Sequence, residues 1–134
     1  MLDVQLFDLH TFLPKPYEEA LLPRLKKAHE ELQTGTGLGG RNQEIALSAA
    51  REIAGFRDTA VFSFGSDGTD GPTDAAGGYC DGESCAALAA RGVSIPDVLQ
   101  QNDAYHALQK CDGLILTGPT GTNVNDLSVL LIRR

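Results

Sequence analysis

Residues 60–74 of the chain read AVFSFGSDGTDGPTD, and this stretch does the most to decide the fold. Its first five residues are almost wholly apolar, which is typical of a strand buried within a sheet. The next ten contain three glycines and three aspartates, residue types that favour turns. Ligands of open α/β sheets bind beyond the carboxyl ends of the strands. The sequence therefore predicts a buried strand that delivers a polar loop to a candidate site.

Two further segments, one on each side in the sequence, also place a glycine-rich polar loop next to a predicted strand or helix. Residues 114–116 (Leu-Ile-Leu) predict a second buried strand, and the glycine- and threonine-rich loop 117–123 follows it directly. Residues 35–40 form another glycine-rich loop, which leads into a helix expected over residues 42–55 with alanines along its buried face. In chain order the first loop is residues 35–40, the second is residues 65–74 and the third is residues 117–123. We expect the three loops to meet at one rim of the sheet.

The rest of the chain supplies the other elements of an α/β domain. Periodicity and capping signals predict strands at residues 2–6 and 127–132, and helices at 17–32, 84–90, 94–100 and 103–109. The expected fold class is α/β: a layered mixed β-sheet flanked by helices, with Gly/Asp-rich loops at one rim. The change in composition near residue 34 divides the chain into a segment 1–34 and a domain 35–134.

Composition and charge narrow the class of protein. A formal net charge of -7 argues against a nucleic-acid partner, because phosphate backbones require a basic face. No apolar run reaches the roughly 18–20 residues that a membrane span needs, and no secretory signal is visible at Met1. The three cysteines lack metal-ligand spacing and suit a reducing compartment. A cytoplasmic protein with a small-molecule ligand is the expectation.

Each loop offers groups that could carry chemistry. Glycine N–H groups and a helix N-terminus in the first loop could cradle an anion, with Arg41 adding a charged fork. Asp67, Asp70 and Asp74 in the second loop are close enough in sequence to invite Mg²⁺. Hydroxyl and backbone donors in the third loop could hold a carboxylate or phosphate. The simpler alternatives are a linker with an ordinary helix cap, aspartates that cap turns, and a wide turn between strands.

Three long motifs make the chain resemble a known family. Residues 39–44 (GGRNQE), 66–77 (SDGTDGPTDAAG) and 117–127 (TGPTGTNVNDL) resemble, in this order, three signatures of the MOFRL domain. That domain is the C-terminal half of class II glycerate kinases, which are often named hydroxypyruvate reductases. The resemblance covers about residues 35–134, with Ser66 at a position where the family usually has threonine.

The resemblance implies transfer of phosphate from ATP to the 2-hydroxyl of D-glycerate, with Mg²⁺. It implies catalytic roles for Arg41, Asp67 and Asp70, and metal binding by Asp67, Asp70 and Asp74. The substrate-binding residues that it implies are Gly39, Gly40, Asn42, Gln43, Thr120, Gly121, Thr122 and Asn123.

The family also has a larger N-terminal domain, which residues 1–34 do not resemble. We therefore expect one half of a kinase, which is inactive without its N-terminal domain. A separate subunit could supply that domain, or the chain could form a homo-oligomer. A non-catalytic module that binds a small anion or docks on a subunit is the alternative from another class. The hydroxypyruvate reductase name is a further alternative, although no dinucleotide fingerprint is present in these residues.

Overall fold

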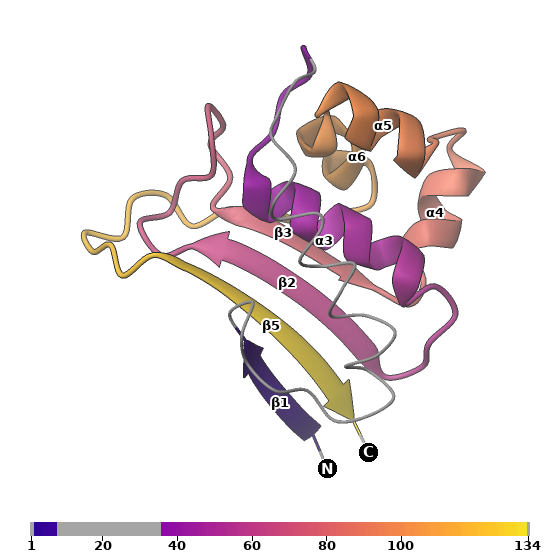
Figure 1. Ribbon diagram of the computed structural model, residues 1–134, viewed down its shortest axis with the longest axis horizontal. Helices are drawn as coiled ribbons and strands as arrows, with labels where there is room; N and C mark the ends of the chain where they lie inside the picture. Colours follow the sequence, from indigo (N-terminus) through magenta and orange to yellow (C-terminus); the bar gives the residue numbers. More distant parts are fainter. Residues whose placement is uncertain (1, 8–35, 134) are drawn as a thin grey trace.

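The computed structural model describes residues 2–7 and 36–133. These residues form a sheet with strand order β1-β5-β2-β3-β4 and helices packed on it (Figure 1). The elements in chain order are β1 (Leu2–Phe7), α3 (Arg41–Glu52), β2 (Thr59–Gly65), β3 (Gly77–Asp81), α4 (Ser84–Ala90), α5 (Ile95–Gln101), α6 (Ala104–Lys110), β4 (Leu114–Ile115) and β5 (Asp126–Arg133). The layered α/β class expected from the sequence is confirmed. The predicted helix 17–32 and the boundary at residue 34 lie outside the described residues.

The sheet is antiparallel at every described pair of neighbouring strands, so the prediction of a mixed sheet was wrong in this respect. The cause is β3, which the sequence analysis missed. β3 lies between β2 and β4, so these two strands run in the same direction without being neighbours. The loops that follow them therefore leave the sheet at the same end.

β3 was missed because it begins with two glycines, which have low β-propensity. A Cβ on Gly77 would overlap the backbone of Ser63 on β2, and a Cβ on Gly78 would lie 2.7 Å from Leu108 Cδ1. The glycines allow β2 and α6 to pack tightly against the strand. Close packing, rather than local preference, determines this element.

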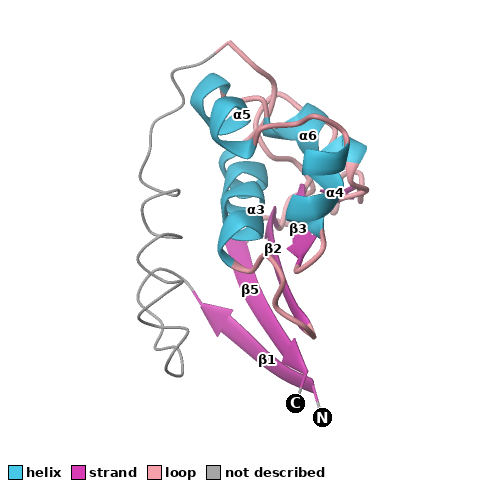
Figure 2. Cartoon of the chain, turned by 90° about the vertical axis from the view of Figure 1, so that its right-hand side faces the viewer, coloured by secondary structure: helices cyan, strands magenta, loops and turns pink. Residues whose placement is uncertain are grey.

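The helices pack on one face of the sheet. α3 packs against β2 and β3, and its residues Ile45, Ala49 and Ile53 form one buried cluster with Val61 of β2 and Leu130 of β5. The second cluster joins α3 to α4, α5 and α6 around Cys80, the β3 residue opposite Val61. Figure 2 shows α3 beside β2 with the shorter helices gathered around it. Within the described ranges, no helix is long and apolar enough to cross a membrane.

Candidate functional site

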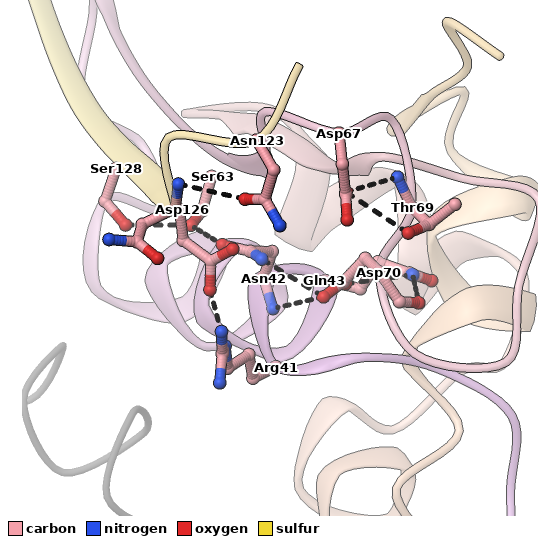
Figure 3. A network of polar contacts seen from close by, with 11 residues as sticks. Arg41, Asn42, Gln43, Ser63, Asp67, Thr69, Asp70, Asn123, Asp126 and Ser128 are labelled. Atoms are coloured by element: carbon pink, nitrogen blue, oxygen red, sulfur yellow. Dashed lines mark hydrogen bonds and ion pairs between the residues drawn. The ribbon is translucent and has the colours of Figure 1, made fainter. Parts of the chain in front are cut away.

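The three glycine-rich loops contact one another at the end of the sheet where β2 stops and β5 begins (Figure 3). The second and third loops are joined by hydrogen bonds from Val124 N to Ser66 Oγ (2.7 Å) and from Thr120 N to the carbonyl of Asp67 (3.2 Å). The first and second loops meet at the N-terminus of α3. Segments far apart in the sequence thus build a single structure.

Glycine is required where these backbones touch. Gly71 has φ +63°, and a Cβ there would lie 2.6 Å from the carbonyl oxygen of Gly39. Gly68 has φ +91°, and a Cβ there would overlap the carbonyl oxygen of Gly118. Side chains at these positions would be strained by the left-handed backbone and would also push the loops apart.

Asp70 caps helix α3 from a distance of 28 residues in sequence. Its Oδ1 accepts from Asn42 N (3.2 Å) and Asn42 Nδ2 (3.1 Å), and its Oδ2 accepts from Gln43 N (2.9 Å) and Gln43 Nε2 (3.0 Å). Burial to 4% exposure raises the pKa of Asp70, and these four N–H groups oppose that rise. The N-terminus of α3 therefore already holds an anion, which is the protein's own carboxylate.

The amide side chains of Asn42 and Gln43 face inward. They are 1% and 0% exposed, and Asn42 Oδ1 accepts from Ser63 Oγ (2.6 Å), which in turn lies 2.8 Å from Ser128 Oγ. Gln43 Nε2 donates to Thr73 Oγ1 (3.0 Å), whereas Gln43 Oε1 is buried and has no hydrogen-bond partner in the described structure. Gly39 and Gly40 are also buried. Asn42, Gln43, Gly39 and Gly40, all predicted to bind substrate, are therefore buried and support the surface of the site rather than form it.

Arg41 is the predicted site residue that faces outward. Its side chain is 64% exposed, and its Nε donates to Asp126 Oδ2 at 2.5 Å. This hydrogen bond, together with the charge of Asp126, raises the pKa of Arg41 above its ordinary value. The site thus presents one permanent positive charge at its open surface.

The remaining predicted aspartates have separate partners. Asp67 Oδ1 accepts from the backbone N–H (3.0 Å) and hydroxyl (3.1 Å) of Thr69, whereas Asp74 accepts from the hydroxyl of Tyr105 on α6 (2.8 Å). Because Asp70 accepts hydrogen bonds from the start of α3, the three carboxylates do not surround a common point. In the part of the chain that the structure describes, no group of three or more His, Cys, Asp or Glu side chains could hold a metal ion.

The third loop lies open to solvent. Its predicted substrate-binding residues are Thr120, Gly121, Thr122 and Asn123, all exposed. Thr120 Oγ1 donates to the carbonyl of Ser66 (2.5 Å), and Asn123 Oδ1 accepts from Asn125 N (3.1 Å). Two large apolar residues flank this loop, Leu116 at 62% exposure and Val124 at 68%.

Sequence reasoning missed the partners of these residues. The third motif contains Asp126 without indicating a role for it, and nothing in the sequence singles out Ser63, Ser128 or Thr73. The available signal for Asp126 was its position as a charged residue immediately before a predicted strand. The others carried no signal, because their partners are distant in sequence.

Known proteins are similar to this chain in both sequence and fold. The MOFRL family model matches residues 29–126, which confirms the resemblance. D-glycerate 2-kinase of Thermotoga maritima is 55% identical over 98 residues, which are 73% of this chain and 24% of the relative. Glycerate 2-kinase of Pyrococcus horikoshii is 49% identical over 96 residues, or 72% of this chain and 22% of the relative.

A solved structure agrees with the sequence relatives. The crystal structure of a glycerate kinase from Thermotoga maritima matches with a TM-score of 0.73 at 54% identity, covering 75% of this chain and 24% of that chain. The chain thus spans about a quarter of the length of the relatives that it matches. On the family match and this shared fold, the chain belongs to the MOFRL family.

Proposed function

We propose that residues 36–133 form one wall of a D-glycerate 2-kinase site, at which phosphate passes from ATP to the 2-hydroxyl of D-glycerate. The observation that carries the proposal is the exposed guanidinium of Arg41, fixed where the three family motifs meet. The relatives' names, glycerate 2-kinase and D-glycerate 2-kinase, supply the substrate and the reaction.

The chemistry of phosphoryl transfer suits such a wall. Catalysis depends mainly on positioning and on neutralising the charge of the transferred group. The guanidinium of Arg41 could bind the carboxylate of D-glycerate or the transferring phosphoryl group through paired N–H donors. The exposed hydroxyls and backbone N–H groups of residues 120–123 add uncharged donors beside it.

The exposed apolar residues favour a wall that faces another polypeptide surface. A self-contained anion-binding module would need a polar surface around its ligand, but Leu116 and Val124 are largely exposed on either side of the third loop. Contiguous exposed apolar surface is typical of sites that another protein covers, and these two residues would contribute to such a surface beside the loop. We therefore place the opposite wall on an N-terminal domain, in the same protein or in a partner, and we expect the isolated wall to lack turnover.

Mg²⁺ stays a prediction that rests on the family resemblance. Because Asp70 and Asp74 are held by other groups, the described residues do not fit a magnesium site built from the three predicted ligands. Asp67 is the one of the three that is neither buried nor tied to a neighbouring helix. No step of the proposed reaction is assigned to a metal.

A chimera tests the proposal. Residues 36–133 would replace the matching segment of the Thermotoga maritima D-glycerate 2-kinase, and ADP release would be measured with ATP, Mg²⁺ and D-glycerate. We expect turnover in the chimera and a loss of about 100-fold or more with Arg41→Ala, as for removal of a charge-stabilising donor. A folded chimera whose turnover is the same with and without Arg41 would refute the role of this wall.

A further inference from the structure

We infer that Asp126 is a positioning residue, which holds Arg41 by one nitrogen and directs its other two nitrogens toward an oxyanion ligand. The inference rests on the proposed function and deepens it, because it names the group that orients the proposed anion-binding side chain. It also names the ligand chemistry, a carboxylate or phosphate that can accept two parallel hydrogen bonds.

The contact between the two side chains involves one edge of the guanidinium. Arg41 Nε donates to Asp126 Oδ2 at 2.5 Å, and within residues 36–133 neither terminal nitrogen of Arg41 donates a hydrogen bond. A guanidinium is planar and carries its donors in a fixed fork, so fixing Nε also fixes the direction of the terminal pair. With Nε occupied, the terminal pair is the edge that remains to bind a carboxylate or phosphate with two hydrogen bonds.

Both partners are anchored on regular elements. Asp126 is the first residue of β5 and lies opposite Gly65, in a strand that pairs with β2 on one side and β1 on the other. Its Oδ1 lies 3.4 Å from the point that a Cβ on Gly65 would occupy, so the carboxylate rests against bare backbone. Arg41 is the first residue of α3, whose start is held by Asp70. A side chain fixed in this way loses less freedom when it binds a ligand.

The exposed fractions of the two side chains differ, which fits different roles for Arg41 and Asp126. The side chain of Arg41 is 64% exposed, whereas that of Asp126 is 23% exposed. The cation therefore faces solution, and the carboxylate stands behind it. This asymmetry suits an orienting group better than a competing ligand, because an approaching anion would meet the guanidinium first.

A second ion pair on β5 provides the matched comparison. Arg133 near the end of β5 donates to Asp58, and both side chains are exposed, at 67% and 41%. That pair lies at the opposite end of the strand from Asp126, away from the three loops. An effect common to any surface ion pair would appear at both places, whereas orientation of Arg41 would not involve Asp58.

The full chain can be titrated with D-glycerate, with calorimetry for affinity and ¹H–¹⁵N spectra for the arginine Nε–H groups. We expect a protected Arg41 Nε–H signal that is lost with Asp126→Ala and partly kept with Asp126→Asn, whose amide oxygen still accepts. Affinity should fall about threefold to tenfold with Asp126→Ala, as expected when one long side chain must be newly ordered on binding. Asp58→Ala should leave both readings unchanged.

Two results would overturn the inference: an unprotected Arg41 Nε–H in the wild-type chain, or binding as tight or tighter with Asp126→Ala. Tighter binding would mean that Asp126 only neutralises Arg41. The proposed function fails separately, if Arg41→Ala binds D-glycerate as well as the wild type or if the wild type does not bind it. In the latter case the Nε–H signals of the two Asp126 variants still decide the orientation of Arg41.

Discussion

Removing the carboxylate of Asp70 should destabilise the whole domain, although sequence analysis proposed this residue for catalysis. Asp70→Ala deletes the acceptor for four N–H groups of Asn42 and Gln43. Gln43 Nε2 keeps two other partners, the carbonyl of residue 70 and Thr73 Oγ1. The three other donors lose their partner in a region that is almost fully buried.

The size of the effect follows from these donors. A buried donor without a partner costs about 1–3 kcal/mol, and loss of a helix cap alone costs about 1 kcal/mol. Because water and small shifts will relieve part of this cost, we expect Asp70→Ala to lower the free energy of unfolding by about 3–5 kcal/mol. Asp70→Asn keeps one acceptor oxygen but turns an NH₂ group toward other donors, so its loss should be about 1–3 kcal/mol.

Urea unfolding of the full chain, followed by circular dichroism, measures this difference. Asp67→Asn is the matched control in the same loop, because among residues 36–133 its carboxylate accepts only from the exposed Thr69 and its loss should cost below about 1 kcal/mol. If Asp70→Ala costs no more than Asp67→Asn, the carboxylate of Asp70 does not stabilise the start of α3. In that case the start of α3 would be held by other contacts, and Asp70 would regain its candidacy as a catalytic carboxylate.

Two further predictions concern the loops. Gly68→Ala should destabilise the chain by clearly more than Gly121→Ala in thermal unfolding, because both have positive φ but only Gly68 faces another backbone; equal losses would show that the loops do not touch. Partial burial alone would raise the pKa of Asp103, but the Leu38 N–H and His106 outweigh it and hold the pKa below its usual range. A lowered carboxyl pKa stabilises the fold above about pH 4, and this stability is lost as pH falls through the folded-state value. Asp103→Asn should therefore flatten the acid side of a plot of urea midpoint against pH, whereas a parallel decline in both proteins would contradict this account.

Local signals in the sequence located most elements of the fold. The helix predicted over residues 84–90 is α4, and Ser94 caps α5 by accepting from Asp97 N, as a serine before a helix indicates. The strand predicted over residues 60–64 is β2, one residue longer at each end. These elements are set by side chains within one or two turns, which a reader of the sequence can see.

Features that depend on distant partners were not accessible in the same way. The capping of α3 joins Asp70 to residues 28 positions away, and a reader of the sequence sees only an aspartate in a turn. The ion pair between Arg41 and Asp126 spans 85 positions. The motifs contain the loops that contact one another, but only the fold shows which of their residues are buried, such as Asn42 and Gln43, and which are exposed, such as Arg41.

The position of β5 between β1 and β2 has a consequence for how the chain folds. β5 comes after every other described element in sequence, yet it lies between β1 and β2 and supplies Asp126. During synthesis β1 and β2 would both present unpaired edges until residues 126–133 emerge, and such edges are prone to association. Contacts of such long sequence separation also slow folding. The placement of Asp126 beside Arg41 thus depends on pairing between strands that are far apart in the sequence.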